Sequence, residues 1–322
     1  MSKPILVIST SVDAATDAVV NYFDRHDVAY VRINTEDMPF CGCVSVAYQD
    51  KMAPQIYINI HNQMDEPASS FHSIWYRRLR APAPPESMDP GVYDFSIRET
   101  RTTLIGTVFS NASKIMSPPE SVWRAENKLF QLRVATDIGL SIPDTLVSND
   151  PTMIRNFYSS TSQGLVIKPV RTGYLVNQGE SRSIYTNRFL DKHLDCLQEA
   201  QYSPSIYQAF VDKTYDIRAT YVGGHIFTAA IHSQTDNRAL VDWRRTSNPD
   251  LPHSVHQLPS TLENNVRVLM KTLGLEYGAI DFVLDSGGRY YFLEVNPNGQ
   301  WLWLDRLLEL GITEAVSTWL MQ

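Results

Sequence analysis

Two late apolar segments that carry acidic side chains constrain the fold of this chain most strongly. Tyr277–Leu284 contains Asp281, and Arg289–Val295 contains Glu294. The turn residues Asp285–Gly288 between them predict a β-hairpin. Because an unpaired carboxylate inside an apolar strand is costly, the hairpin predicts a site that uses these oxygens.

The oxygen donors of this hairpin favour a magnesium site. Asp281 and Glu294 can converge on adjacent strands, and Asn296 points the same way as Glu294 because side chains alternate along a strand. Carboxylate and amide oxygens suit Mg²⁺, which also binds phosphate oxygens. No basic residue adjoins the three in the sequence, which favours a metal site over a buried salt bridge.

Two lysines are candidates for binding phosphate. Lys168 ends the apolar strand predicted over Gly164–Pro169, where an ammonium group needs an anionic partner. Lys128 lies in residues 119–139, which begin with Pro and end with Gly and are predicted to form one helix. Taken alone, each is also compatible with an ordinary lysine that faces solvent.

Two further segments carry the remaining candidates. Ile206–Val211 is apolar apart from Gln208, so its backbone could face an adenine edge, although an ordinary core strand fits too. Asp216 and Arg218 share one face of a strand. The planar guanidinium group of Arg218 suits phosphate oxygens or the oxyanion of acyl transfer. Asp216 would orient this group or steer a nucleophile. The alternative is a surface cross-strand pair.

The rest of the chain suggests three parts. Residues 1–60 open with a strand, a helix and a second strand, which favours a parallel sheet. Residues 171–183 are polar and predict a loop or hairpin, and residues 205–232 predict three successive antiparallel strands. A chain of 322 residues exceeds one ordinary core. We expect domains at residues 1–117, 118–204 and 205–322, the last with the metal site.

Composition excludes several classes of protein. The net charge of −7 argues against nucleic-acid binding. No apolar run reaches the roughly 20 residues of a membrane span, and the first ten residues lack the features of a signal peptide. These features predict a cytoplasmic protein with no membrane partner. The three cysteines predict reduced structural thiols.

The order of these features resembles the ATP-grasp superfamily. The resemblance covers about residues 114–300 and includes D-x-R, A-I-D-F and L-E-V-N-P-N, and no Walker A loop is present. It implies an α/β (α+β) ATP-grasp fold, with an N-terminal parallel-sheet pre-ATP-grasp domain and two α+β subdomains that clasp ATP. The roles it implies are ATP phosphate contacts by Lys128 and Lys168, adenine contacts by Gln208, Ala209, Phe210 and Val211, and two Mg²⁺ ions held by Asp281, Glu294 and Asn296.

A narrower resemblance is to the microviridin-type (graspetide) peptide macrocyclases. It rests on the segments N-P-N-G-Q-W-L-W at residues 296–303, D-W-R at 242–244 and I-Y-T-N at 184–187. Such enzymes phosphorylate an Asp or Glu side chain of a ribosomal precursor peptide. A Thr or Ser hydroxyl, or a Lys amine, of the same peptide then forms an ω-ester or ω-amide ring. A leader segment is held away from the active site.

This resemblance assigns the remaining candidates. Arg218 would stabilise the acyl phosphate, and Asp216 would position Arg218 or accept the proton of the nucleophile. A local cation cluster would draw in the acidic peptide core. The candidates for substrate binding are Arg171, Arg182, Arg244, Arg245 and Trp301, although Trp301 also fits a core position at the start of the last helix. For His232 a structural role is favoured.

Two other functions fit the same features. The first is a carboxylate–amine ligase that resembles glutathione synthetase or the ribosomal-protein glutamate ligases. The second is a non-catalytic nucleotide-binding regulator, against which the three retained metal-ligand candidates argue. The sequence gives neither the precursor, the number of rings, the leader-binding residues nor the choice between ester and amide, for which the resemblance favours ester. A homodimer is compatible with the family and leaves no sequence signal.

Overall fold

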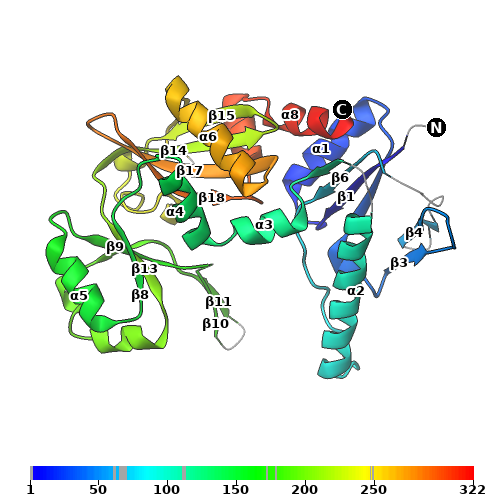
Figure 1. Cartoon of the computed structure of the whole chain (residues 1–322), viewed down its shortest axis with the longest axis horizontal. Helices are drawn as coiled ribbons and strands as arrows, with labels where there is room; N and C mark the ends of the chain where they lie inside the picture. The colour runs from blue at the N-terminus through cyan, green and yellow to red at the C-terminus, as the bar shows by residue number, and fades with distance from the viewer. Residues whose placement is uncertain are drawn as a thin grey trace. The chain divides into compact units, whose positions relative to one another are not determined.

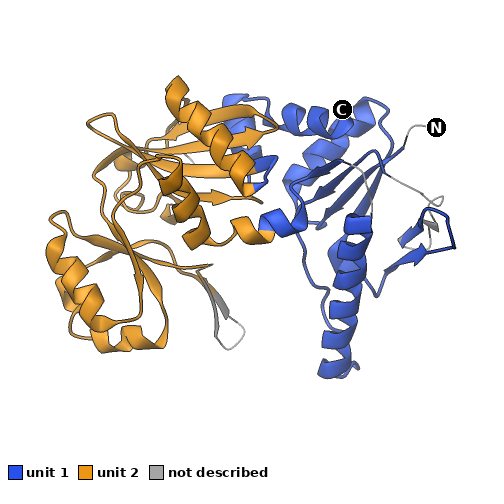
Figure 2. Cartoon of the chain, in the orientation of Figure 1, with its two compact units in different colours: residues 1–122, 274–277, 300–322 blue, residues 123–273, 278–299 orange. Residues whose placement is uncertain are grey.

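The computed structural model describes residues 3–60, 63–64, 71–110, 114–171, 173–177, 180–246, 248 and 250–322. The chain forms two compact units (Figure 2). Unit 1 comprises residues 1–122, 274–277 and 300–322, and unit 2 comprises residues 123–273 and 278–299. Among the described residues, no helix has the length and apolarity that crossing a membrane requires.

Unit 1 is built on the predicted parallel sheet. Its strands follow the order β2-β1-β6-β7, and all neighbours run parallel. Helices α1 and α8 contact each other beside this sheet (Figure 1). The bounds are β1 Ile5–Ser9, α1 Ala14–Arg25, β2 Tyr30–Asn34, β6 Ser73–Tyr76, β7 Lys114–Met116 and α8 Ile312–Met321.

A second, antiparallel sheet and two further helices complete unit 1. The sheet has the order β3-β4-β5, and its apolar side chains share a core with those of the parallel sheet and of α2. The long helix α2 buries only part of its surface, including Leu104 and Val108. The bounds are β3 Gly42–Ala47, β4 Gln55–Ile60, β5 Gln63–Met64, α2 Pro90–Ser110 and α7 Leu302–Leu308.

The first sheet of unit 2 has the order β12-β9-β13-β8. Helix α5 packs its buried Ile154 against apolar side chains of this sheet, including Leu165 and Tyr207. The predicted loop or hairpin at residues 171–183 is a hairpin of strands β10 and β11. The bounds are β8 Thr145–Ser148, α5 Pro151–Ser160, β9 Leu165–Pro169, β10 Tyr174–Asn177, β11 Glu180–Ser183, β12 Asn187–Phe189 and β13 Ser205–Ala209.

The second sheet of unit 2 is antiparallel, with the order β16-β15-β14-β17-β18. Helix α6 is amphipathic, and its Met270 contacts Gly278 of β17. Helix α4 contacts both α6 and β18 (Figure 1). The bounds are α4 Lys128–Asp137, β14 Lys213–Val222, β15 His225–Ile231, β16 His253–Val255, α6 Ser260–Leu273, β17 Tyr277–Asp285 and β18 Tyr290–Asn296.

The structure corrects two sequence predictions. Residues 119–139 form two helices, α3 (Pro119–Ala125) and α4, because the side chain of Asn127 accepts hydrogen bonds from the first turn of α4 and so starts a new helix. The three strands predicted over residues 205–232 belong to two sheets, since β13 pairs with β8 and β9 while β14 pairs with β15.

A buried ion pair joins distant segments of unit 1. The Arg77 Nε lies 2.5 Å from Asp13 Oδ2, and both side chains are almost fully buried. The guanidinium group also lies over the rings of Trp75 and Trp301. Burial alone would raise the pKa of Asp13, but the Arg77 charge and hydrogen bonds from Arg77 and Gln300 lower it to about 2. The pair therefore stabilises unit 1 whenever Asp13 is ionised.

We predict that Asp13→Asn lowers the free energy of unfolding by about 3 kcal/mol at neutral pH, because it leaves Arg77 buried without its anion. The folded pKa of about 2 lies below the ordinary value of 3.8. The stabilisation is thus complete above about pH 4 and is lost as the pH falls through about 2. Urea unfolding of the wild type and of Asp13→Asn across this pH range measures the stabilisation.

Asp17→Asn is the matched control. It breaks a 2.6 Å pair with Arg32 in which the Asp17 side chain is 49% exposed, so it should cost less than about 1 kcal/mol. Equal losses in the two variants, or a loss in Asp13→Asn that does not shrink in acid, would contradict the role given to the Asp13–Arg77 pair.

Candidate functional site

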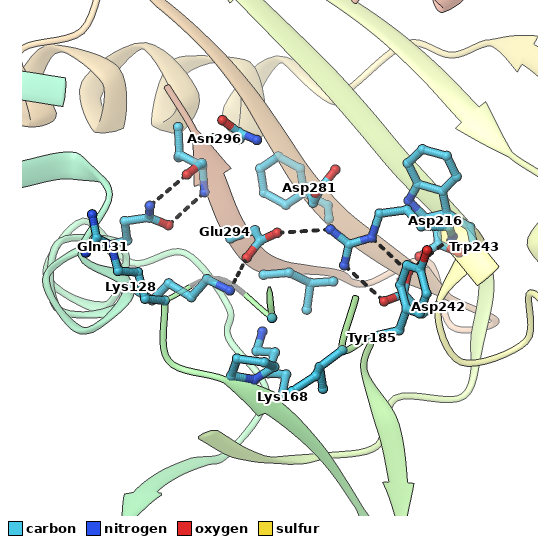
Figure 3. A pocket seen from close by; sticks show the side chains of 18 of the residues that line it. Lys128, Gln131, Lys168, Tyr185, Asp216, Asp242, Trp243, Asp281, Glu294 and Asn296 are labelled. Carbon is cyan, nitrogen blue, oxygen red and sulfur yellow. Dashed lines mark hydrogen bonds and ion pairs between the residues drawn. The ribbon is translucent and has the colours of Figure 1, made fainter. Parts of the chain in front are cut away.

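The predicted hairpin of β17 and β18 is confirmed and places two carboxylates side by side. Asp281 lies opposite Glu294, and Ala279 lies opposite Asn296. All three predicted metal ligands line one cavity of about 480 Å³ in unit 2 (Figure 3). The Glu294 side chain is only 16% exposed, so the cavity wall holds a carboxylate that needs a charged partner.

That partner is Lys128. Its Nζ lies 2.8 Å from Glu294 Oε2. Lys128 is the first residue of α4, since the side chain of Asn127 accepts from the backbone N–H groups of Leu129 and Phe130. The break in the predicted helix therefore sets the position of the ammonium group in the cavity.

The buried side chain of Gln131 holds α4 against β18. It donates through Nε2 to the backbone oxygen of Val295 at 2.7 Å and accepts from the Val295 N–H at 2.7 Å. Gln131 and Lys128 are three residues apart, so they share one face of the helix. The amide pair thus fixes the distance between Lys128 and Glu294, which neighbours Val295 in the sequence.

Lys168 supplies a second ammonium group, at the end of β9 (Figure 3). Burial lowers the pKa of Lys168 to about 8; the Glu294 charge opposes this shift, and the Lys128 and Arg244 charges add to it. Burial would raise the pKa of Glu294, but the cations Lys128, Lys168 and Arg244 lower it to about 2. At neutral pH one anionic carboxylate therefore faces three cations.

The second carboxylate of the hairpin has its own cation. Arg218 Nη1 lies 2.6 Å from Asp281 Oδ1, and both side chains are largely buried. The backbone at Gly299 passes close to this pair: a side chain there would overlap Ala279 and come within 3.4 Å of Arg218 Nη2. The glycine of the N-P-N-G segment is therefore required by close packing beside Arg218.

Asp216 and Arg218 share a face of β14 as predicted, and their partners differ. Asp216 is buried and lies 2.7 Å from Lys213 Nζ, while Ser233 Oγ donates to its Oδ2 at 2.5 Å. Burial raises the pKa of Asp216, against the lowering effect of Lys213 and Ser233. Both carboxylate oxygens of Asp216 thus accept hydrogen bonds from the protein itself.

Arg244 reaches the cavity from the short helical turn Trp243–Arg245. Its Nε and Nη2 donate to the two oxygens of Asp242 at 2.9 and 3.0 Å, and its Nη1 lies 3.6 Å from Glu294 Oε1. Although burial opposes the charged form, the Asp242 pair and the Glu294 charge raise the pKa of Arg244. Arg244 is therefore a permanent cation beside Glu294.

The segment Gln208–Val211 lines a second, more apolar cavity. Val166, Val283 and Leu293 form its other walls. This cavity shares Lys168, Asp216, Val241 and Leu293 with the charged one, so the two adjoin. The backbone N–H groups of Ala209 and Phe210 already donate to the oxygens of Asp144 and Gly164. The Gln208 side chain donates to Thr145 Oγ1.

The candidates for substrate binding divide between two locations. Arg171 and Arg244 line the charged cavity. Arg182 is exposed on β11 and Arg245 donates to Asn187 Oδ1, and neither is among the described residues that line it. Trp301 occupies the core position that the sequence left open, since its ring is fully buried in unit 1 against Trp75 and Tyr277. His232 contacts Ser254 and Tyr215.

The structure corrects one premise of the metal prediction. Basic side chains do lie beside the oxygen donors, as the pairs of Glu294 with Lys128 and of Asp281 with Arg218 show. Each basic side chain and its carboxylate come from segments far apart in the chain, so the residues next to the carboxylates in the sequence could not reveal these pairs. Among the described residues, no group of three or more His, Cys, Asp or Glu side chains could hold a metal ion by itself.

The sequence also missed three residues that organise the site. Lys213 donates to the backbone oxygen of Val241 in addition to pairing with Asp216. Gln131 clamps α4 to β18. The sequence indicated Asp242 only as part of the D-W-R segment, although its carboxylate binds the Arg244 side chain. The available signals were weak: Gln131 lies one helical turn after Lys128, and Lys213 lies three residues before Asp216.

Comparisons with known proteins agree with this architecture. Residues 4–121 match the family model described as the MvdD pre-ATP grasp domain. The macrocyclase MdnC from Microcystis aeruginosa MRC, solved with its precursor peptide MdnA, superposes with a TM-score of 0.86 at 29% identity, covering 99% of each chain. No curated protein sequence matches the chain.

Two further solved structures are similar over almost the whole chain. A Chryseobacterium gregarium RiPP-associated ATP-grasp ligase, in complex with ADP and a leader and core peptide, has a TM-score of 0.92 at 27% identity, covering 100% of this chain and 97% of that one. The macrocyclase MdnB from Microcystis aeruginosa MRC has a TM-score of 0.81 at 29% identity, covering 99% of both chains. Residues 4–121 thus match a pre-ATP-grasp domain of the MvdD type, and the chain shares the fold of these ATP-grasp enzymes from end to end, which supports an ATP-dependent ligase.

Proposed function

We propose that this enzyme uses ATP to cyclise a ribosomally made precursor peptide. It would convert Asp or Glu side chains of the peptide into acyl phosphates and join each to a hydroxyl or amine of the same peptide. The observation that carries the proposal is one cavity lined by the cations Lys128, Lys168 and Arg244 and by two in-register carboxylates, Glu294 and Asp281, the second of which is paired with Arg218. The end-to-end likeness to peptide-bound MdnC supports a peptide substrate.

The two adjoining cavities suit the two ends of ATP. The apolar cavity along Gln208–Val211 would hold adenine. Backbone groups of this segment other than the N–H groups of Ala209 and Phe210, which are already engaged, would contact the base. The ammonium groups of Lys128 and Lys168 would bind phosphate oxygens as compact point charges. Lys128 would then exchange its Glu294 partner for phosphate, which releases that carboxylate for another cation.

The oxygen donors of the hairpin fit Mg²⁺. Asp281, Glu294 and Asn296 provide two carboxylates and one amide, and Mg²⁺ is commonly bound by one or two carboxylates together with substrate phosphates. We infer that these residues hold two Mg²⁺ ions. When bound, Mg²⁺ neutralises negative charge on the transferred phosphoryl group.

The chain's own residues would stabilise acyl transfer. Arg218, fixed by its pair with Asp281, offers guanidinium donors to the oxygens of the acyl phosphate and of the tetrahedral intermediate. Of the two roles considered for Asp216, positioning fits better than proton acceptance, because Lys213 and Ser233 already occupy its oxygens. Asp216 would thus be a positioning residue on β14, the strand that also carries Arg218.

The peptide would be drawn in by local positive charge. Arg171 and Arg244 line the cavity, and Arg182 lies on the neighbouring hairpin. Because the whole protein carries a net charge of −7, such a local cluster must offset repulsion of an acidic peptide core. A reaction that needs ATP and a newly made peptide supports the cytoplasm as the location of the enzyme.

The proposed reaction has a direct test. The protein is incubated with ATP, Mg²⁺ and acidic precursor peptides that contain Thr, Ser or Lys, and each peptide is weighed by mass spectrometry. Every ring formed should remove the mass of one water and release one ADP. Unchanged peptides together with ligation of free amino acids would favour the glutathione synthetase type of ligase, and nucleotide binding without ADP release would favour a regulator.

We predict that Glu294→Gln lowers turnover at least about 100-fold, because metal-ion stabilisation of the transition state contributes several kcal/mol. Circular dichroism and the unfolding midpoint should show a folded protein. Glu263→Gln, which breaks a partly exposed i,i+4 pair with Arg267 on α6, is the matched control and should keep wild-type turnover. Near-normal turnover in Glu294→Gln would remove Glu294 from the reaction.

The lowered pKa of Lys168 predicts a pH-dependent affinity for ADP. Below about pH 8 the side chain is charged in the free enzyme, and above it the side chain is neutral. Phosphate attracts only the charged form, so the dissociation constant of ADP should rise above about pH 8, by at most about tenfold per pH unit. Calorimetric titrations between about pH 7 and about pH 9.5 measure this effect.

Two variants identify the titrating group. Lys168→Arg keeps its charge over this range and should give a flat profile, since an arginine side chain stays protonated. Lys192→Met removes an exposed lysine outside the cavity and should keep the wild-type profile. A wild-type profile that persists in Lys168→Arg would assign the pH dependence to a different group.

A further inference from the structure

Part of the chain between β15 and β16 forms a loop beside the charged cavity. Residues 236–246 of this segment, here called the Asp242 loop, contain only the short helical turn Trp243–Arg245. Thr246 Oγ1 donates to Asp236 Oδ2 at 2.7 Å and closes the loop. Lys213 Nζ donates to the backbone oxygen of Val241 at 3.3 Å and ties the loop to β14.

The carboxylate of Asp242 is the most heavily used group of the loop. Asp242 is only 4% exposed. Its Oδ1 accepts from the backbone N–H and the Nε of Arg244 at 3.1 and 2.9 Å, and its Oδ2 accepts from Arg244 Nη2 at 3.0 Å and from the Thr186 N–H at 3.1 Å. Four donors thus converge on one buried anion. Burial would raise the pKa of Asp242, but Arg244 and the backbone donors lower it.

This arrangement decides which way Arg244 points. Nε and Nη2 of its planar guanidinium group are bound to Asp242, so Nη1 is directed toward Glu294 Oε1, 3.6 Å away. A bidentate Arg–carboxylate pair fixes orientation as well as distance. Arg244 therefore presents one donor edge to the reaction centre while its other edge is held by the protein.

The same carboxylate also anchors the chain that leaves the β10–β11 hairpin. Thr186 follows that hairpin, and its N–H donates to the Asp242 oxygen that holds Arg244 Nη2. The next residues repeat the link, since Arg245 Nη2 donates to Asn187 Oδ1 and lies over the ring of Tyr185. The I-Y-T-N and D-W-R segments singled out in the sequence therefore contact each other through Asp242.

We propose that Asp242 is a positioning residue. It aims the Arg244 side chain at the reaction centre and holds it beside the segment at residues 184–187. The proposal rests on the proposed function for the identity of the reaction. Arg244 Nη1 would donate to the substrate carboxylate or its acyl phosphate once Glu294 is engaged elsewhere. An asparagine could not replace Asp242, because it has one acceptor oxygen in place of two and would turn an N–H group toward Arg244 or Thr186.

A double-mutant cycle tests whether Asp242 acts through Arg244. Peptide-dependent ADP release is measured for the wild type, Asp242→Asn, Arg244→Ala and the double variant, with kcat and KM for the peptide determined separately. Each single variant should lose about 10- to 100-fold in kcat/KM for the peptide. The double variant should match Arg244→Ala within about twofold, because removing Arg244 removes the side chain through which Asp242 acts on the reaction. Losses that multiply would overturn the proposal.

Asp236→Asn controls for the folding of the loop. Asp236 closes the Asp242 loop through Thr246 and pairs with Arg238, and no contact joins it to Arg244 among the described residues. This variant should lose less than about threefold in kcat/KM for the peptide. A loss as large as that of Asp242→Asn would assign the effect to loop folding and overturn the proposal.

A spectroscopic signal separates this inference from the proposed function. The NMR resonance of the Arg244 Nε–H group, assigned by its absence in Arg244→Ala, should shift and exchange faster in Asp242→Asn and stay unchanged in Asp236→Asn. An Arg244 resonance that ignores Asp242→Asn would overturn the inference. A wild-type enzyme that is inactive on every peptide would contradict the proposed function, while this resonance would still decide whether Asp242 positions Arg244.

Discussion

The site depends on the attraction between one buried carboxylate and the cations around it. Glu294 projects from an apolar strand, and Lys128, Lys168 and Arg244 surround it. A buried charge without a partner is costly, and the Glu294 side chain is only 16% exposed. Together these groups keep one another charged, which is why the pKa of Glu294 falls to about 2 while the pKa of Lys168 falls only to about 8. The cavity thus carries the charges that binding of a metal–phosphate complex would require.

Local structural devices set the distances in this cluster. The register of β17 and β18 puts Asp281 beside Glu294. The cap formed by Asn127 starts α4 at Lys128, and the Gln131 amide locks that helix to the backbone of β18. Asp242 fixes the orientation of the Arg244 side chain through two hydrogen bonds. The charged side chains are therefore held by buried hydrogen bonds of neutral or oppositely charged neighbours, which is the usual means of pre-organising a site.

Local signals in the sequence were enough to predict the hairpin, the parallel sheet of unit 1 and the segments that carry Lys168, Arg218 and Glu294. Apolar alternation and turn residues encode these features within a few positions. The sequence could not predict the ion pairs, since Arg218 and Asp281 meet only after distant strands have assembled. Nor could it predict the helix break at Asn127, because Glu126 and Asn127 are both tolerated inside a helix at little cost. The position of Trp301 was also ambiguous, because tertiary packing decides whether an aromatic side chain lies in a core or lines a cavity.

The central claim is that the ion pairs of the charged cavity are exchanged for phosphate and metal when nucleotide binds. A crystal structure with Mg²⁺ and a non-hydrolysable ATP analogue tests it most directly. The account predicts that Lys128 leaves Glu294 for a phosphate oxygen, that Asp281 and Glu294 coordinate metal, and that adenine lies against residues 208–211. A triphosphate bound elsewhere, with the Lys128–Glu294 pair intact, would contradict it.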